Sequence, residues 1–182
     1  CFNLIQSIEA RQSRVTTERV WNDPRPTIDV YYRNVTKIYF RLVPYRFDDY
    51  IKAARYSPEQ LDVNTRKELV TQRPVLAWSA DLPATKDYKE RLERIPSPDD
   101  LASGPYYLIA SHNKEFSETD NQISFCEVWE SKLAVITRNN PGQGLIDGFV
   151  LDAETGDPIG EATVKGWRRE RNKFVAIPSV TS

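Results

Sequence analysis

The chain is poor in the side chains that most enzymes use for chemistry. Its 182 residues include one histidine, two cysteines and no methionine. A zinc site usually takes about four ligands, drawn mainly from histidine and cysteine, and a nucleophilic triad needs a histidine base. With His112 as its one histidine, the sequence is a weak source of either arrangement. We therefore expect a protein that is not an enzyme, with no catalytic residues, no cofactor and no bound metal.

Long apolar runs and an excess of one charge are also missing. No segment approaches the roughly 18 apolar residues that a helix needs to cross a bilayer, so we expect no membrane span. Lys and Arg number 25 and Asp and Glu number 26, which gives a net charge of -1. Nucleic-acid binding depends on a basic surface, and the balance therefore argues against DNA or RNA as a partner. The hydrophobic fraction of 40% is that of a globular protein.

The two cysteines have different explanations. They do not make a disulfide framework. Cys1 stands where translation does not begin, so it is either the lipid-modified residue of a bacterial lipoprotein or a fragment boundary that falls on a cysteine. Cys126 lies in the apolar stretch 123–128 and is predicted to be a small buried side chain rather than a nucleophile.

Alternation of polar and apolar residues predicts strands in the first part of the chain. Residues 27–32 place Ile28, Val30 and Tyr32 on one face, and residues 37–43 repeat the pattern. A period of two residues with one apolar face is typical of an antiparallel sheet. Further strands are predicted at 14–21, 75–80, 105–111 and 123–137, the last with a kink at 130–132, and a polar hairpin loop is predicted at 113–121.

The segment from about residue 48 to residue 100 is predicted to be a helical insertion. Ser57 and Pro58 match the N-cap and first position of a helix that ends at Arg73. Residues 86–94 are densely charged and carry apolar residues at helical spacing, which indicates a solvated helical connector. A short helical turn is expected after Ser97.

A stretch rich in Asn, Pro and Gly at 139–144 is the strongest linker signal in the chain. It divides the sequence into a first domain at 1–140 and a second at 141–182, with strands predicted at 145–151, 162–167 and 174–177. So short a second segment cannot close a core of its own, and we interpret it as the N-terminal part of a second sandwich. It should present an unpaired strand edge and part of its apolar face.

Residues 148–164 carry a motif of the form D-x-x-T-G-x-P. In it, Asp152 can cap a turn and Gly156 supplies a positive φ, while Pro158 ends strand pairing and the small Gly160 lets the next strand pack closely. The motif resembles the opening of macroglobulin domains and of carboxypeptidase-regulatory-like domains. Glu161 departs from the usual pattern, which has glycine at that position.

Two other segments, 27–43 and 103–109, resemble strands of an early macroglobulin domain in bacterial alpha-2-macroglobulin-like proteins. The resemblance implies a mostly β fold of tandem antiparallel Ig/fibronectin-like β-sandwiches, the first with a helical insertion and the second truncated. Proteins of this family are large modular protease traps, and many capture the protease through a thioester. The residues after Cys1 and Cys126 do not match the thioester motif.

The resemblance therefore implies a non-catalytic structural module of a protease inhibitor. Its expected location is the bacterial cell envelope, either periplasmic or surface-exposed, with Cys1 as the residue that a lipid anchor would modify. The expected partners are the other domains of the same large chain and, through the full-length protein, proteases. Two alternatives stay open: an adhesion or assembly module of a bacterial surface protein, and a carbohydrate-binding domain that uses exposed aromatic residues.

The remaining candidate residues each have an ordinary structural explanation. His112 is predicted to lie in a surface loop. The pairs Asp48–Asp49 and Asp99–Asp100 could act as glycosidase carboxylates, but the second pair is better explained as first-turn acids of a helix. Aromatic residues of the predicted strands are interpreted as core or cross-strand pairs, and they include Trp21, Tyr31, Tyr32, Trp78, Trp129 and Trp167. The basic run is interpreted as a solvated hairpin, with Lys165, Arg168, Arg169, Arg171 and Lys173.

Overall fold

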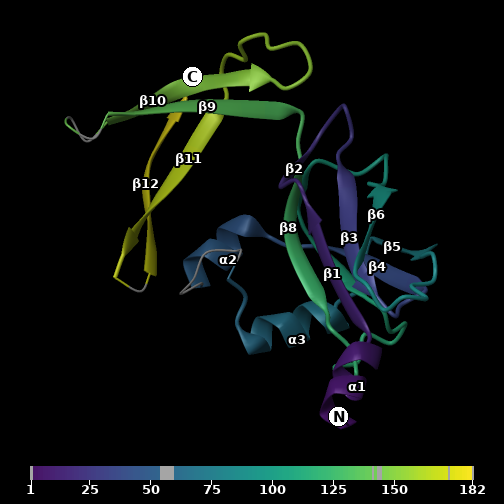
Figure 1. The fold of residues 1–182 in the computed structure, drawn as a ribbon. Coiled ribbons are helices and arrows are strands. Elements are labelled where there is room, and N and C mark those ends of the chain that lie inside the picture. The colour runs from purple at the N-terminus through teal and green to yellow at the C-terminus, as the bar shows by residue number, and fades with distance from the viewer. Residues whose placement is uncertain (1, 54–59, 141, 143–144, 172, 182) are drawn as a thin grey trace.

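Strands are the main regular secondary structure of the chain (Figure 1). The computed structural model describes residues 2–53, 60–140, 142, 145–171 and 173–181. The elements in chain order are α1 (Phe2–Glu9), β1 (Gln12–Thr17), β2 (Val20–Trp21), β3 (Thr27–Arg33), β4 (Lys37–Pro44), α2 (Phe47–Ala53), α3 (Val63–Thr71), β5 (Leu76–Asp81), β6 (Arg91–Pro96), β7 (Gly104–Ser111), β8 (Ser124–Glu130), β9 (Leu133–Asn140), β10 (Leu145–Asp152), β11 (Thr163–Glu170) and β12 (Lys173–Thr181).

Strands β1 to β8 form a two-sheet sandwich. One sheet has the order β1-β3-β6, and the other has the order β2-β8-β7-β4-β5. All pairs in them are antiparallel except the short β2, which runs parallel to β8. The predicted alternation is confirmed, because Ile28 and Val30 of β3 are buried with Phe40 and Leu42 of β4 in the same core cluster.

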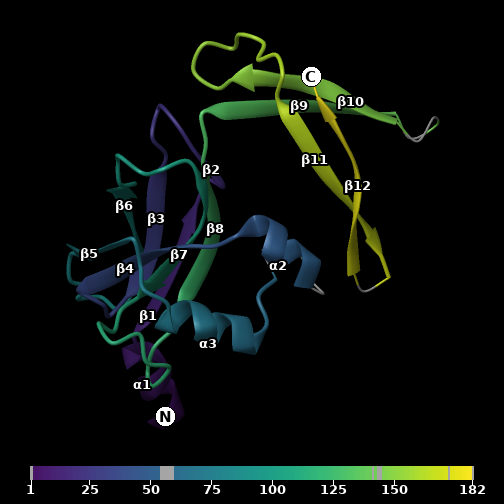
Figure 2. The same ribbon diagram turned by 180° about the vertical axis from the view of Figure 1, so that it is seen from behind.

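The five-stranded sheet is covered on both faces, which explains why its central strand, β7, has buried residues on both faces. Six consecutive residues of β7, from Tyr106 to Ser111, are buried. One face belongs to the main core, while the other packs Val43, Tyr107 and Ile109 against Leu69 of α3. Helices α2 and α3 lie on this second face (Figure 2). A strand buried on both faces loses the alternating pattern and reads as a continuous apolar run.

The helical insertion is shorter than predicted. Its helices end at Thr71, and β5 and β6 then join the two sheets. Helix α3 begins at Val63, and its N-cap is Asp62, whose Oδ1 accepts a hydrogen bond from the Thr65 backbone N–H at 2.9 Å. The predicted N-cap Ser57 and first-turn Pro58 lie outside the described residues.

Two further helical predictions in this segment are wrong. The charged stretch predicted as a helical connector ends in β6, where Ile95 pairs with Ile28 at the edge of the three-stranded sheet. Charged side chains suit an edge strand, because they discourage pairing with other chains. The turn after Ser97 is not helical either, since Asp100 has a φ of 57°. None of the helices in the described ranges is long and apolar enough to span a bilayer.

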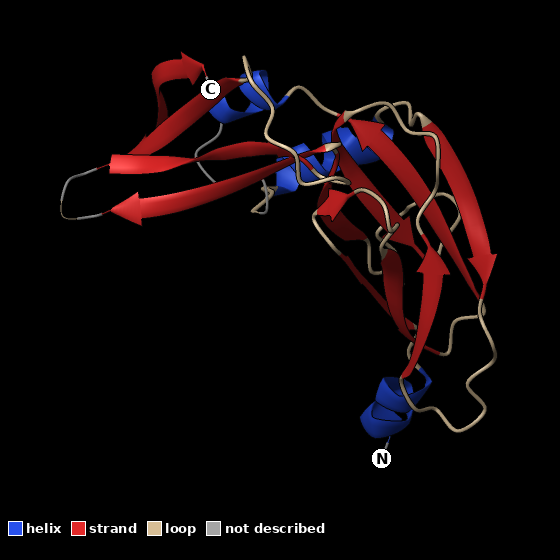
Figure 3. Ribbon diagram, turned by 90° about the horizontal axis from the view of Figure 1, so that it is seen from above, coloured by secondary structure: helices blue, strands red, loops and turns tan. Residues whose placement is uncertain are grey.

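The rest of the chain forms two antiparallel hairpins, β9–β10 and β11–β12 (Figure 3). Strands β9 and β10 pair from Asn140 opposite Leu145 to Leu133 opposite Asp152. The predicted domain boundary after residue 140 therefore falls between two paired strands. The chain leaves the sandwich at residues 131–132, between β8 and β9. The domain division itself stays a prediction.

In the motif at 152–158, Asp152 and Gly156 fold as predicted, whereas Pro158 does not end strand pairing, because it forms an antiparallel bridge with Leu151. Asp152 Oδ1 accepts hydrogen bonds from the backbone N–H groups of Glu154 and Thr155, both at 2.9 Å, and these bonds lower the pKa of the carboxyl. Gly156 has a φ of 76°. The explanation for Gly160 is wrong, because a side chain there would meet no atom within 4 Å.

The apolar exposure predicted for residues 141–182 is present there, at Ile146, Phe149, Ile177 and Val180, and β9 shares it. Val135, Ile136 and Phe149 expose 59%, 57% and 68% of their surface. Phe149 lies opposite Ile136, and Val135 lies opposite the buried Val150, so the two exposed sets occupy opposite faces of the β9–β10 ribbon. The exposed large apolar residues of the hairpins are Leu133, Val135, Ile136, Ile146, Phe149, Ile177 and Val180.

Gly148 is required by the close approach of β9, and this requirement can be tested. A Cβ at this position would lie 2.2 Å from the backbone oxygen of Ile136. We expect Gly148→Ala to lower the free energy of opening of the β9–β10 hairpin by about 1–3 kcal/mol, measured by amide hydrogen exchange. Gly160→Ala is the matched control, and equal exchange in both variants would contradict this explanation.

Candidate functional site

The most densely connected polar groups of the described chain lie where the sandwich meets the hairpins. Strand β8 supplies two carboxylates at this junction, Glu127 and Glu130, and runs through residues 131–132 into β9. Glu127 faces the helices and Glu130 faces the core side, because alternate residues of a strand point to opposite faces. Both glutamates are buried.

Glu127 is surrounded by donors from three parts of the chain. Its side chain is 1% exposed, and its Oε2 lies 2.8 Å from a guanidinium nitrogen of Arg19. Its Oε1 accepts a hydrogen bond from the Tyr45 hydroxyl and another, at 3.0 Å, from the Trp129 indole N–H. A buried carboxylate without such partners would cost several kcal/mol, so these contacts are what allow it to stay inside.

Tyr45 lies at the centre of an aromatic cluster. Its ring centroid is 4.6 Å from that of Tyr107 and 5.8 Å from that of Tyr50. Burial raises the pKa of the Tyr45 hydroxyl, and its hydrogen bond to the Glu127 carboxylate raises it further. The phenol therefore remains a proton donor to Glu127 throughout the physiological pH range.

Phe47 extends this cluster to the hairpins. As the first residue of α2, it places its ring 5.1 Å from Trp129 of β8 and 5.4 Å from Trp167 of β11, edge-on to both. Edge-to-face pairs are favourable because the positive ring edge meets the negative ring face. One phenylalanine thus connects a strand of the sandwich with a strand of the second hairpin.

An ion pair and several backbone bonds support the same junction. Asp48 follows Phe47, and its carboxylate lies 3.0 Å from Lys165 Nζ on β11. Ser131 donates its backbone N–H to the carbonyl of Trp21 at 3.2 Å, and Ala153 donates to Lys132 at 2.9 Å. The first hairpin is therefore fixed near its start, and the second is held through α2.

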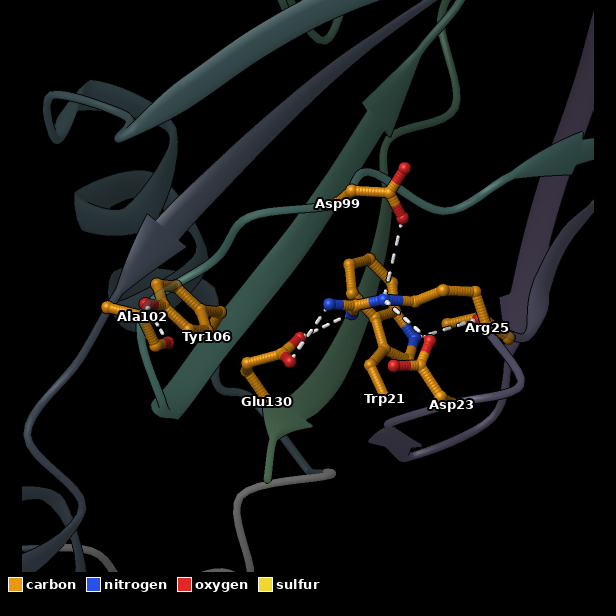
Figure 4. A network of polar contacts seen from close by, with 8 residues as sticks. Trp21, Asp23, Arg25, Asp99, Ala102, Tyr106 and Glu130 are labelled. Atoms are coloured by element: carbon orange, nitrogen blue, oxygen red, sulfur yellow. Dashed lines mark hydrogen bonds and ion pairs between the residues drawn. The ribbon is translucent and has the colours of Figure 1, made fainter. Parts of the chain in front are cut away.

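Glu130 forms the second polar centre, with Arg25 (Figure 4). Arg25 Nη1 lies 2.5 Å from Oε2 and Nη2 lies 3.0 Å from Oε1, which is the two-point geometry that makes guanidinium–carboxylate pairs strong. The Glu130 side chain is 7% exposed. The hydrogen bond to Glu130 raises the pKa of Arg25, whose charge is therefore permanent.

Arg25 also contacts the loops at this end of the sandwich. Arg25 Nε lies 3.6 Å from an Asp99 oxygen and 4.0 Å from an Asp23 oxygen. The indole of Trp21, which is fully buried, lies beside this network in Figure 4. Tyr106, on the neighbouring strand β7, donates its hydroxyl to the Ala102 carbonyl at 2.7 Å. The arrangement joins three segments around one cation and leaves Asp99 in a structural ion pair.

The structure separates the acid pairs that could have acted together. Asp48 pairs with Lys165, whereas Asp49 lies 2.9 Å from Arg46. Asp99 pairs with Arg25 in the second polar centre. Within the described ranges, no group of three or more His, Cys, Asp or Glu residues could hold a metal ion. Asp48, Asp49 and Asp99 each have a cation beside them.

His112 and Cys126 both have structural partners. His112 Nε2 lies 2.7 Å from the Asp120 carbonyl and Nδ1 lies 3.1 Å from Ser13 Oγ, so the imidazole connects the 112–121 loop to β1. The thiol of Cys126 lies 3.4 Å from the Val15 carbonyl, and burial raises its pKa to about 11. The neutral thiol is the stable form at neutral pH.

The tryptophans do not form an exposed platform. Trp21 is fully buried, and Trp78 is half-buried and stacks on Phe40 at 4.9 Å. Trp129 and Trp167 are half-buried on either side of Phe47. In the basic run, Lys165 pairs with Asp48, and Arg168 pairs with Glu170 of the same strand. The interpretation of the aromatics as packing residues agrees with these contacts.

The sequence analysis named Asp48, Trp129, Lys165 and Trp167, but it did not single out the other junction residues. Arg25, Tyr45 and Phe47 stand in turns or at element ends, where alternation gives no signal. Glu127 and Glu130 did offer a sequence signal, since they flank Trp129 inside an apolar strand. A charged residue within such a strand indicates a buried ion pair or an outward face, and the pattern alone does not separate these.

The buried Tyr45 hydroxyl predicts a loss of stability at alkaline pH. Its pKa is raised above the value of 10.0 that it takes when unfolded, so above pH 10 the unfolded chain releases a proton that the folded chain keeps. Each such tyrosine lowers the free energy of unfolding by about 1.4 kcal/mol per pH unit. We expect Tyr45→Phe to make the decline shallower by that amount in urea denaturation, and an unchanged slope would contradict the assignment.

Removing the Phe47 ring should loosen the second hairpin and spare the sandwich. Phe47→Ala removes the contacts with Trp129 and Trp167 together. We expect faster amide exchange in β11 and β12 and unchanged exchange in β4 and β7. Phe149→Ala, which removes a ring that is 68% exposed, is the control and should leave β11–β12 exchange unchanged. Equal exchange of β11–β12 in wild type and Phe47→Ala would show that Phe47 does not hold the hairpin.

Comparisons with known proteins identify the fold. No protein-family model matches the sequence, and no curated protein matches it. Among solved structures, the chain is similar to native alpha-2-macroglobulin from Escherichia coli in a crystal structure spanning domains NIE-MG1. The TM-score is 0.60 at 13% identity, and the match covers 96% of this chain and 83% of that chain. At an identity this low, the structural match shows a shared fold alone. The predicted fold class is confirmed, and the fold is alpha-2-macroglobulin-like.

Proposed function

We propose that the chain is a non-catalytic structural module of a large alpha-2-macroglobulin-like protease inhibitor. The observation that carries the proposal is the exposed apolar surface of the two hairpins, on a fold shared with an alpha-2-macroglobulin. Soluble monomers seldom expose large contiguous apolar patches, and a two-stranded ribbon has marginal stability by itself. Such ribbons are expected where further strands or domains cover them.

The junction supports a role as a spacer. Phe47 and the Asp48–Lys165 pair hold the second hairpin against the sandwich, while Glu127 and Glu130 hold the loops from which the hairpins depart. The carboxylates of Glu127 and Glu130 each pair with a neighbouring arginine, Arg19 and Arg25. A module built this way sets the positions of neighbouring domains, and its proposed partners are other domains of the same chain.

The cellular setting is part of the proposal. A protease inhibitor of this kind would act in the cell envelope of a bacterium, in the periplasm or at the surface. Cys1 would be the residue that carries a lipid anchor if the natural protein has one. Proteases would be partners of the full-length protein rather than of this module.

The activity of the full gene product tests this function. We expect a protease mixed with the full-length protein to keep its activity on small peptide substrates and to lose it on large protein substrates, because a trapped protease is enclosed. The isolated module should leave both activities unchanged. A full gene product that leaves cleavage of large substrates unaffected would contradict the proposal, and binding of host-surface proteins instead would favour an adhesion module.

A further inference from the structure

A cavity of about 550 Å³ lies on the sandwich, away from the junction residues. One wall is helix α3, which contributes Arg66, Lys67 and Val70. The other wall is the loop before β8 together with the start of that strand, and it contributes Phe116, Ile123 and Phe125 among others. Pockets that bind ligands commonly have volumes of about 300–1,000 Å³ and an apolar lining with a few polar groups, as this one has.

The loop wall is held rigidly in an uncommon conformation. Phe116 has a φ of 57°, which a bulky residue rarely adopts, and yet it is 4% exposed. Asn113 Oδ1 accepts a hydrogen bond from the Glu115 N–H at 2.8 Å, and Asn121 Nδ2 donates to the Ser117 carbonyl at 2.6 Å. Backbone strain of this kind is maintained by its surroundings and gathers at sites of function.

Two arginine side chains lie over aromatic rings that line the cavity. The guanidinium of Arg41 lies 4.0 Å from the centre of the Phe116 ring, and its Nη1 donates to the Val70 carbonyl at 3.0 Å. The guanidinium of Arg66 lies 5.7 Å from the centre of the Phe125 ring. Stacking fixes the plane of a guanidinium and leaves N–H groups at its edge that can bind a carboxylate.

A second, more open hollow of about 470 Å³ lies on the other side of Phe116. It is lined by Lys37, Arg41 and Lys114, and no acidic residue is among its described lining. Glu118 is the carboxylate that lines the first cavity. The two hollows therefore have five lysines and arginines against one acidic residue in their lining, in a chain whose net charge is -1, and one of the five, Lys37, lies 3.2 Å from an Asp81 oxygen outside that lining.

We propose that these two hollows bind an acidic peptide segment that carries a large apolar side chain. The apolar side chain lies against Phe116, Ile123 and Phe125, and flanking carboxylates pair with Arg66 and Lys67. The segment continues past Phe116 toward Lys114, because two hollows separated by one side chain suit an extended chain. Charge complementarity selects an acidic occupant, since like charges across an interface weaken binding. This site does not depend on the function proposed above.

Fluorescence anisotropy with a defined probe tests the site. The probe is a fluorescein-labelled peptide with phenylalanine at its centre and glutamates on both sides. We expect the double variant Arg66→Glu/Lys67→Glu to weaken binding by about tenfold, because two exposed ion pairs become repulsive. The matched control Lys86→Glu/Lys89→Glu makes the same change in charge on exposed residues that line neither hollow, and should bind like wild type.

Two comparisons complete the test. A peptide with lysines in place of the glutamates, and one with alanine in place of phenylalanine, should each bind at least about tenfold more weakly to the wild-type protein. Amide NMR shifts caused by the glutamate peptide should map to α3 and residues 113–125. The proposal would be overturned if the glutamate peptide bound the two double variants equally, if the lysine peptide bound wild type as tightly as the glutamate peptide, or if no peptide bound. Binding of laurate, a fatty acid, in the cavity without peptide binding would also overturn it.

Discussion

One buried carboxylate, Glu127, lies at the junction between the sandwich and the hairpins. Glu127 pairs with Arg19 and accepts hydrogen bonds from the Tyr45 hydroxyl and the Trp129 indole. These two hydrogen bonds bring the Tyr45 and Trp129 side chains together at the Glu127 carboxylate. Phe47 then packs between Trp129 and Trp167. Because each partner comes from a different part of the chain, loss of the carboxylate would leave several polar groups without a partner at once. The orientation of the second hairpin depends on this arrangement.

The hairpins that leave this junction expose apolar side chains. They leave the sandwich beside the Arg25–Glu130 pair and carry apolar side chains such as Ile136 and Phe149 in solvent. Such exposure suits the proposed role as a module of a larger chain, because neighbouring domains would cover these side chains.

The sequence predicted the parts of the fold that follow from alternation, and missed those that depend on tertiary contacts. Strands such as β3 and β4, with Ile28 and Phe40 turned inward, follow from period two alone. Strand β6 was missed because its charges resemble a solvated helix until pairing with β3 is known. A boundary after residue 140 was predicted because the Asn-, Pro- and Gly-rich composition of 139–144 is typical of a linker, whereas the structure pairs β9 with β10 on either side of it. The junction around Tyr45 and Glu127 was missed for a similar reason, since its residues meet across 82 positions of sequence.

Amide hydrogen exchange of residues 133–181, in the isolated chain and in the full gene product, tests the central claim most directly. If the hairpins are ribbons that other domains cover, their amides should exchange much faster than those of β4 and β7 in the dilute, monomeric module and become strongly protected in the full protein. The sandwich strands β4 and β7 should be protected equally in both. Protection of the hairpins in the isolated monomer as strong as that of β4 and β7 would contradict the account, because it would show a complete domain that needs no cover.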